Sequence, residues 1–145
     1  MRQIMILALT TFILSGCASE GNRNVPLPYS ITEALTFKDY KARLDDVGLY
    51  YGDQRHPRVT RSLGVRTTSQ RSNAVGRENK ESCARAFASA LLRLRATALR
   101  MGGDAVIDIK SNYRHNEVSS ETHYQCASGR KVSAVALKGT IVKLR

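Results

Sequence analysis

The sequence predicts an α+β fold in which one long helix packs on a small antiparallel or mixed sheet. The chain has 145 residues, which suits one domain and is too short for two comfortable ones. An apolar stripe at helical spacing runs from about Lys80 to Met101, and stretches of alternating apolar and polar residues stand on both sides of it. Together these observations predict the element order β-β-α-β-β-β.

Two strands are expected before the helix. Residues 30–44 favour one or two short helical turns, with Thr36 as a cap. The first strand is predicted at 47–51 and the second at 59–69. In the second strand, side chains at alternate positions should share one face; these are Val59, Leu63, Val65 and Thr67.

The helix is the best-marked element. A polar loop over 70–79 should precede it, with Asn79 as the cap, and Gly102 and Gly103 should end it because glycine accepts the left-handed conformation. Its apolar face should consist of residues spaced by three and four, namely Cys83, Phe87, Ala90, Leu91, Leu94, Ala98 and Met101.

Three strands are predicted after the helix, at 105–113, 120–126 and 131–144. In the first of them apolar residues should alternate with polar ones, and in the last they should share one face. They are Ala105, Ile107 and Ile109 in the first strand, and Val135, Leu137 and Ile141 in the last.

Residues 1–16 are predicted to be a secretory signal peptide. Arg2 supplies the positive start, and an apolar stretch follows from Ile4 to Leu14. This stretch is too short for a retained transmembrane helix, which needs about 20 apolar residues. Residues 30–145 are then expected to form a single α+β domain that faces the periplasm.

Cys17 is the predicted lipid attachment site. It ends the tetrapeptide Leu-Ser-Gly-Cys over 14–17, which has the pattern of a lipobox. Acyl chains such as palmitate would then anchor the new N-terminal cysteine in membrane lipid. The alternative is an ordinary signal peptide with a chance cysteine. Residues 17–29 should form a short lipidated tether, stiffened by Pro26 and Pro28.

The chain contains three cysteines, and lipidation of Cys17 leaves Cys83 and Cys126. An even number of cysteines in an oxidising compartment predicts one disulfide. Chain-entropy reasoning gives such a bridge a stabilisation of about 4 kcal/mol. The alternative is two unpaired buried thiols.

Charge is the second compositional signal, because the formal net charge is +11. Between Arg55 and Arg100 stand eleven Lys or Arg, against only Glu78 and Glu81. In the envelope, the expected partners of such a segment are lipopolysaccharide phosphates, anionic lipid heads or an acidic protein surface, and not nucleic acid. The alternative is a solvated basic face without a specific ligand.

Residue patterns that carry chemistry are missing. The three histidines His56, His115 and His123 lack zinc-like spacing to the cysteines and should lie on the surface or in turns. Phosphate-loop and nucleophile-elbow motifs are absent. The polar run from Gly52 to Pro57 is best explained as a turn, with a binding role as the alternative. We therefore expect a non-enzymatic protein without catalytic residues, metal ligands or cofactors.

Three stretches of the C-terminal half have a recognisable pattern, namely 99–107 (LRMGGDAVI), 124–126 (YQC) and 136–141 (ALKGTI). Through them, about residues 80–145 resemble the Rcs-type stress-sensor lipoproteins of enterobacterial outer membranes. This resemblance implies a similar fold, and Cys83 and Cys126 match the positions of a cysteine pair of that family. The chain is also similar to small envelope proteins labelled as excinuclease ATPase subunits, but the nucleotide-binding motifs that this label requires are absent.

Two departures limit what the stress-sensor resemblance implies. Val132 stands about where that family has a further cysteine, and the long proline-rich tether is replaced by a short one. Similarity to Gram-negative lipoproteins in general implies outer-membrane sorting, because Ala18 and not Asp follows Cys17. We therefore expect an outer-membrane lipoprotein with a non-catalytic interaction or envelope-stress-sensing role. The alternative is a structural accessory of an envelope or secretion assembly.

Overall fold

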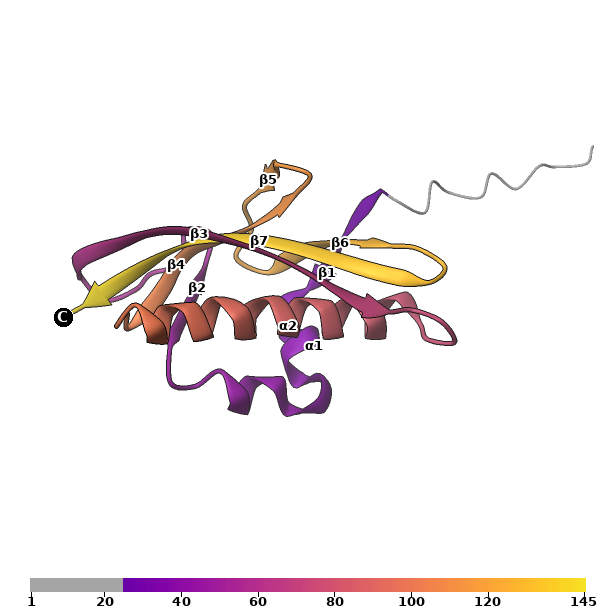
Figure 1. Ribbon diagram of the computed structural model, residues 1–145, viewed down its shortest axis with the longest axis horizontal. Coiled ribbons are helices and arrows are strands. Elements are labelled where there is room, and N and C mark those ends of the chain that lie inside the picture. The colour runs from indigo at the N-terminus through magenta and orange to yellow at the C-terminus, as the bar shows by residue number, and fades with distance from the viewer. Residues whose placement is uncertain (1–24) are drawn as a thin grey trace, which may run out of the picture.

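The computed structural model of the protein describes residues 25–145, and one sheet dominates this part (Figure 1). The predicted signal peptide, Cys17 and the start of the predicted tether lie outside the described residues. The sheet contains seven strands: β1 (Pro26–Ser30), β2 (Gly48–Tyr51), β3 (Val59–Asn73), β4 (Ala105–Tyr113), β5 (Asn116–Val118), β6 (His123–Ser128) and β7 (Val132–Leu144).

The predicted fold class is wrong in the size and make-up of the sheet. Strands account for 45% of the described residues and helices for 29%, so the protein is mostly sheet. Beside α2 (Asn79–Arg100), two short helical segments are present, α1 (Ile31–Thr36) and η1 (Phe37–Arg43). The prediction missed β1 and β5. β5 has three exposed residues and β1 has two prolines, so neither shows apolar alternation.

Strand β7 is the centre of the sheet. Its whole length pairs antiparallel with β3 on one side, from Val132↔Asn73 to Leu144↔Val59. On the other side, β4 pairs with the later part of β7, and β6 pairs only at its start. β2 extends the sheet beyond β4 in parallel orientation, and β1 extends it beyond β6 in antiparallel orientation.

Strand β1 lies within the segment predicted as a tether. Leu27 pairs with Cys126, and Tyr29 pairs with Tyr124. Pro26 and Pro28 fit here because β1 is an edge strand, where a residue without an N–H costs no ladder hydrogen bond on the outer side. The sheet therefore begins at Pro26, four residues before the predicted start of the domain at residue 30.

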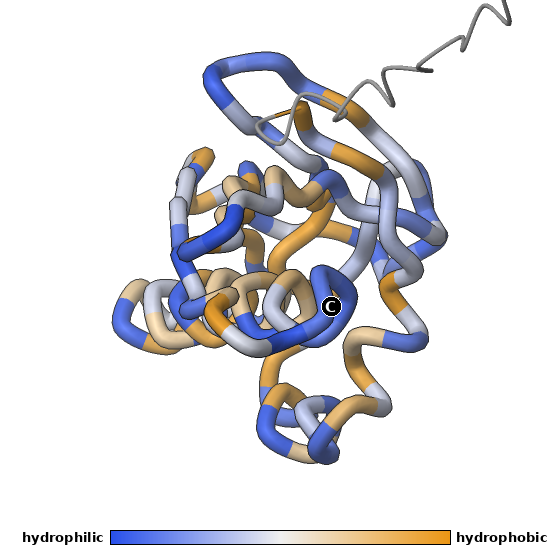
Figure 2. Tube along the Cα trace, turned by 90° about the vertical axis from the view of Figure 1, so that its right-hand side faces the viewer, coloured by the Kyte–Doolittle hydropathy of each residue, from blue (hydrophilic) through white to orange (hydrophobic). Residues whose placement is uncertain are grey.

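Helix α2 packs under the sheet and forms the core with it (Figure 1). Phe87 is fully buried and stacks on Tyr124 of β6 with ring centroids 4.0 Å apart. Seen from the end, hydrophobic stretches gather between the sheet and α2, while the loops are hydrophilic (Figure 2). α2 also contacts α1 and η1, and more of it is buried than the predicted face. The added residues are Ser82, Ala84, Ala86 and Ala88, of which Ser82 is hydrogen-bonded to Ser133 of β7.

Irregularities in two strands explain why the predicted faces were wrong. In β3 the register shifts between Ser62 and Gly64, where Gly64 has φ +110°. Val65, predicted to share a face with Leu63, is consequently 50% exposed. In β4 the register shifts near Asp108, which has φ +49°, so that Val106 and Ile109 are buried while Ile107 is only half-buried. A bulge inserts one residue and thereby reverses the alternation.

The helix caps also differ from the predictions. Thr36 is at the N-cap position of η1, before Phe37, but its side chain makes no capping hydrogen bond. Ser30 caps α1, and its Oγ accepts a hydrogen bond from the Glu33 N–H at 3.3 Å. Glu78 precedes α2 as its N-cap without a side-chain capping bond, while the Asn79 side chain instead accepts from Ser128 Oγ. Gly102 has φ +70° at the end of α2, as the glycine pair predicted.

Candidate functional site

Strand β3 carries a row of arginines along one edge of the sheet. Arg61, Arg66 and Arg71 are exposed, and the fifteen residues of the strand include no acidic residue. The strand is rich in Thr, Ser, Gln and Arg because it pairs with β7 on one side only, and none of its residues is fully buried. Polar side chains therefore remain hydrated here at little cost.

Ion pairs neutralise only some of the eleven cations between Arg55 and Arg100. Four have an acidic partner, in the pairs Lys80–Glu33, Arg85–Glu81, Arg77–Glu81 and Arg95–Asp46. Within residues 25–145, no salt bridge forms to the other seven, which are Arg55, Arg58, Arg61, Arg66, Arg71, Arg93 and Arg100.

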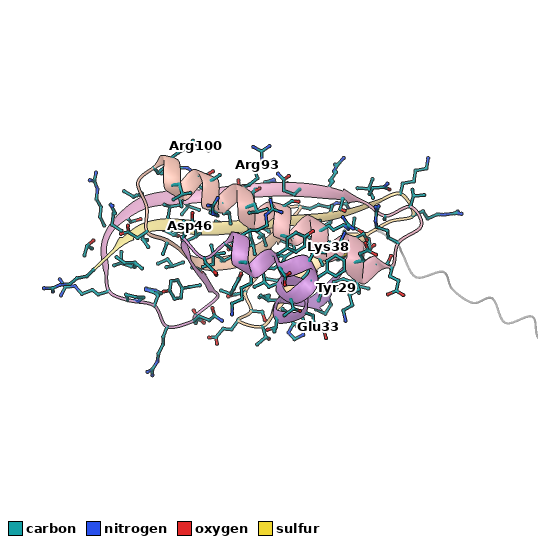
Figure 3. The ribbon with its side chains drawn as sticks, turned by 90° about the horizontal axis from the view of Figure 1, so that it is seen from below. Tyr29, Glu33, Lys38, Asp46, Arg93 and Arg100 are labelled. Carbon is teal, nitrogen blue, oxygen red and sulfur yellow. A yellow bond between two sulfur atoms is a disulfide. The ribbon has the colours of Figure 1, made fainter. Side chains whose placement is uncertain are left out.

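Two of these seven come from α2. Arg93 and Arg100 are exposed and point away from the body along the side on which β3 runs (Figure 3). Helix α2 packs against β3, so the exposed cations of the strand and of the helix come from neighbouring elements. We call this surface the basic edge and define it as Arg61, Arg66 and Arg71 of β3 with Arg93 and Arg100 of α2.

Arg95 has a structural role and does not belong to the basic edge. Its guanidinium donates two hydrogen bonds to the Asp46 carboxylate, on the segment that follows η1. These bonds hold the pKa of Asp46 below its usual value and that of Arg95 above. The pair joins α2 to the 44–47 segment, where Leu44 and Val47 are buried.

A cleft of about 190 Å³ lies between α1 and the start of α2. Its apolar lining comes from Ala34, Phe37, Ala84 and Tyr124, and its polar lining from Ser30, Glu33, Glu78, Lys80 and Glu81. Lys80 contacts Glu33 at 2.6 Å, so one cation already occupies the acidic rim. The cleft therefore offers mixed charge, in contrast to the single sign of the basic edge.

Tyr51 contributes a buried polar atom to the core. Its side chain is 7% exposed, and among the described residues its hydroxyl has no hydrogen-bond partner. Burial raises the pKa of Tyr51 and also that of Tyr124. A void of about 10 Å³ near Tyr51, Phe87 and Tyr124 is about the size of one water molecule.

The histidines and the polar turn are where the sequence predicted them. His56, His115 and His123 are all exposed. His56 lies in the turn from Gly52 to Pro57, next to the Tyr50 ring. In that turn the Gln54 side chain accepts from the Tyr51 N–H at 2.9 Å, so the segment reverses the chain as expected. No group of three or more His, Cys, Asp or Glu suited to a metal ion occurs in the described part of the chain.

Cys83 of α2 and Cys126 of β6 form the predicted disulfide, with Cα atoms 5.9 Å apart. Both residues are almost fully buried, at 0% and 1% exposure. The bond ties the first turns of α2 to the strand that pairs with β1. Cys17, the predicted lipid site, lies outside the described residues.

Sequence reasoning found the charge but not its distribution. It treated all cations between Arg55 and Arg100 alike, although the four-residue spacing of Glu81 and Arg85 within the predicted helix already indicates a helix-surface ion pair. The packing of β3 against α2, which makes one basic edge from two segments, depends on tertiary contacts and had no local signal.

None of the helices in residues 25–145 is both long and apolar enough to span a membrane. No protein-family model, curated protein or solved structure matches the chain.

Proposed function

We propose that the protein is an outer-membrane lipoprotein with a non-catalytic binding role, in which the basic edge contacts an anionic partner of the envelope. One observation carries the proposal: five exposed arginines on the packed elements β3 and α2 have no acidic partner among the described residues. Arginine is the cation best suited to phosphate and carboxylate groups, because its planar guanidinium binds them in a bidentate manner.

The spacing of the arginines favours an extended partner. Arg61, Arg66 and Arg71 recur every five residues, which in a strand corresponds to steps of roughly 16 Å. Arg93 and Arg100 are two helical turns apart, or about 10 Å. A small anion would reach only one of these groups, whereas lipopolysaccharide phosphates or an acidic protein surface could reach several at once.

Lipid attachment at Cys17 would keep this surface near the membrane. The sheet begins at Pro26, so only residues 18–25 would separate the lipidated cysteine from the first strand. Fully extended, such a segment reaches at most about 30 Å. The basic edge lies beyond β6 and β7 from β1, so the anchor would keep the whole domain, this edge included, close to membrane-associated anions.

Metabolic labelling with an alkyne analogue of palmitate tests the lipid anchor. The full chain and its Cys17→Ser variant would be produced in a Gram-negative host, and the membranes separated by density. We expect label and outer-membrane recovery for the full chain and loss of both for the variant. Absence of label on the full chain, or equal recovery of the Cys17→Ser variant in the outer membrane, would contradict the proposed anchor.

A binding assay tests the basic edge separately. The purified full chain should bind vesicles that contain lipopolysaccharide more tightly than neutral vesicles, and added salt should weaken that binding. A variant with Ser at Arg66, Arg71 and Arg93 should lose most of it. Photo-crosslinking from position 71 in the host would then identify the partner. An unaltered envelope-stress reporter after gene deletion would favour the structural-accessory alternative over stress sensing.

A further inference from the structure

The second half of β3 is a regular strand edge without a neighbour among the described residues. From Val65 to Asn73, nine consecutive residues pair one-to-one with Thr140 to Val132 of β7. The irregularities of β3 are confined to its first half, between Val59 and Gly64. A regular edge of this length presents unpaired backbone groups that can accept a further strand.

Hydrogen bonding shows which residues face outward. In an antiparallel pair, successive residues direct their N–H and C=O groups alternately to the two sides of the strand. The Ala74 N–H donates to the Lys131 oxygen at 2.9 Å, in the same register as the β3–β7 ladder. Even-numbered residues therefore face β7, and the odd-numbered residues of this half direct their backbone groups outward.

Two arginine side chains occupy the ends of this outward row. The Val65 carbonyl accepts from Arg66 Nη1 at 2.7 Å, and the Asn73 carbonyl accepts from Arg77 Nη1 at 3.2 Å. Both carbonyls belong to the odd-numbered set, which agrees with the assigned direction. Between them, the backbone N–H and C=O groups of Thr67, Ser69 and Arg71 remain open to a partner.

The charge around this row selects an acidic occupant. Arg66 and Arg71 belong to the row's own strand, and Arg93 of α2 lies on the same side of the molecule. A second copy of the chain would bring identical arginines together and add another formal charge of +11. Like charges opposite one another destabilise a strand pair, whereas opposite charges stabilise it.

We propose that the Val65–Asn73 edge binds an extended acidic segment of a partner protein as an additional strand. Backbone hydrogen bonds to Thr67, Ser69 and Arg71 would provide affinity. Arg66 and Arg71 lie on opposite faces of the strand, because they are five residues apart in a regular pairing. A carboxylate on each face of the added strand would therefore provide selectivity. This inference rests on the proposed non-catalytic binding role, and it specifies the partner as protein and not lipid.

The test uses the full chain and a capped seven-residue peptide of Val and Thr with two Glu spaced five residues apart, so that one Glu lies on each face of the added strand. We expect saturable binding, with slower amide hydrogen exchange at Thr67, Ser69 and Arg71. The same peptide with alternate backbone nitrogens methylated keeps its charge but cannot complete the ladder, so it should bind about tenfold more weakly. A peptide with Lys in place of Glu should not bind.

Two variants at one position separate strand pairing from charge. Ser69→Pro removes the outward N–H and is compatible with an edge strand, whereas Ser69→Ala keeps the N–H. Only the proline variant should lose binding, while both should unfold cooperatively with similar midpoints. If the proline variant proves less stable, the methylated peptide on the unaltered protein decides the question.

Four outcomes would overturn the inference: no binding of the acidic peptide, equal binding of the methylated peptide, protection at other amides, or self-association that Ser69→Pro abolishes. Vesicle binding and Cys17 labelling are measured independently. A failure confined to the peptide experiments would therefore remove the strand-addition site and leave the proposed lipoprotein role standing.

Discussion

Strands β3 and β6 flank the same central strand, β7, but their outer edges differ. The outer edge of β6 is covered by β1, and a disulfide and the Phe87–Tyr124 stack tie β6 to α2. The outer edge of β3 has no strand neighbour among the described residues, and arginines line it. The covalent and aromatic links to α2 are therefore on the β6 side, whereas the β3 side carries charge and open backbone groups.

The largest expected effect tests the β6 side. Replacing Cys83 and Cys126 together by Ser should lower the free energy of unfolding by about 4 kcal/mol, because the bridge closes a separation of 43 residues. Denaturant unfolding of both proteins, with and without reductant, measures the difference. The unfolding midpoint of the unaltered protein should fall when reductant is added, and that of the variant should not change. A difference below 1 kcal/mol would mean that β6 is held mainly by packing.

A smaller effect is expected at the centre of the sheet. A Cβ at Gly139 of β7 would come within 2.6 Å of Val106 Cγ1 on the neighbouring strand β4. Gly139→Ala should therefore destabilise the fold by about 1–3 kcal/mol through overpacking. Ser69→Ala on exposed β3 is the matched control and should leave the unfolding midpoint nearly unchanged. Equal tolerance at both positions would contradict the proposed contrast between core and edge.

Tyr51→Phe should change stability in the opposite direction. The buried Tyr51 hydroxyl has no partner among the described residues, so removing it should raise the free energy of unfolding by about 1 kcal/mol. Thermal unfolding at pH 7 measures the effect. A loss of stability would show that the hydroxyl is hydrogen-bonded, for instance to a water in the adjacent void.

Alkaline unfolding gives an independent check on the same residue. Burial raises the pKa of Tyr51 in the folded protein, so the phenol stays protonated there while its unfolded counterpart ionises near pH 10. The unfolded state then binds fewer protons, and stability falls as pH rises above about 10. The stability of the Tyr51→Phe variant should fall less steeply as pH rises. Tyr124, Tyr29 and Lys110, whose pKa values are also raised in the folded protein, contribute to the remaining slope.

Local sequence patterns predicted the elements that bury one regular face. The helix was expected from about Lys80 to Met101 and spans Asn79–Arg100, and the expected face of β7 is buried at Val135, Leu137 and Ile141. The disulfide followed from counting cysteines. The helix and the β7 face were predictable because a continuous buried face requires apolar residues at regular intervals in the sequence.

Elements fixed by tertiary contacts left no such trace. β1 is a proline-containing edge strand that exists because β6 lies beside it, and the bulges at Gly64 and Asp108 reverse alternation without changing composition. The basic edge also depends on tertiary contacts. Its arginines were visible in the sequence as charge, but the closeness of the two groups of arginines depends on the packing of β3 against α2.

The smallest expected effect on stability completes the comparison. Replacing Arg61, Arg66 and Arg71 together by Ser should change the free energy of unfolding by less than about 0.5 kcal/mol, because none of the three has a salt bridge among the described residues. Chemical denaturation of both proteins measures the change.

Binding of the same variant to anionic vesicles, by contrast, should fall strongly and lose most of its salt dependence, because these cations are the ones that salt would screen. Lys38→Ser with Lys41→Ser, outside the basic edge, is the charge control and should retain binding. If the arginine variant unfolds much more readily, the arginines support the fold; if it binds as before, the basic edge is only a solvated surface.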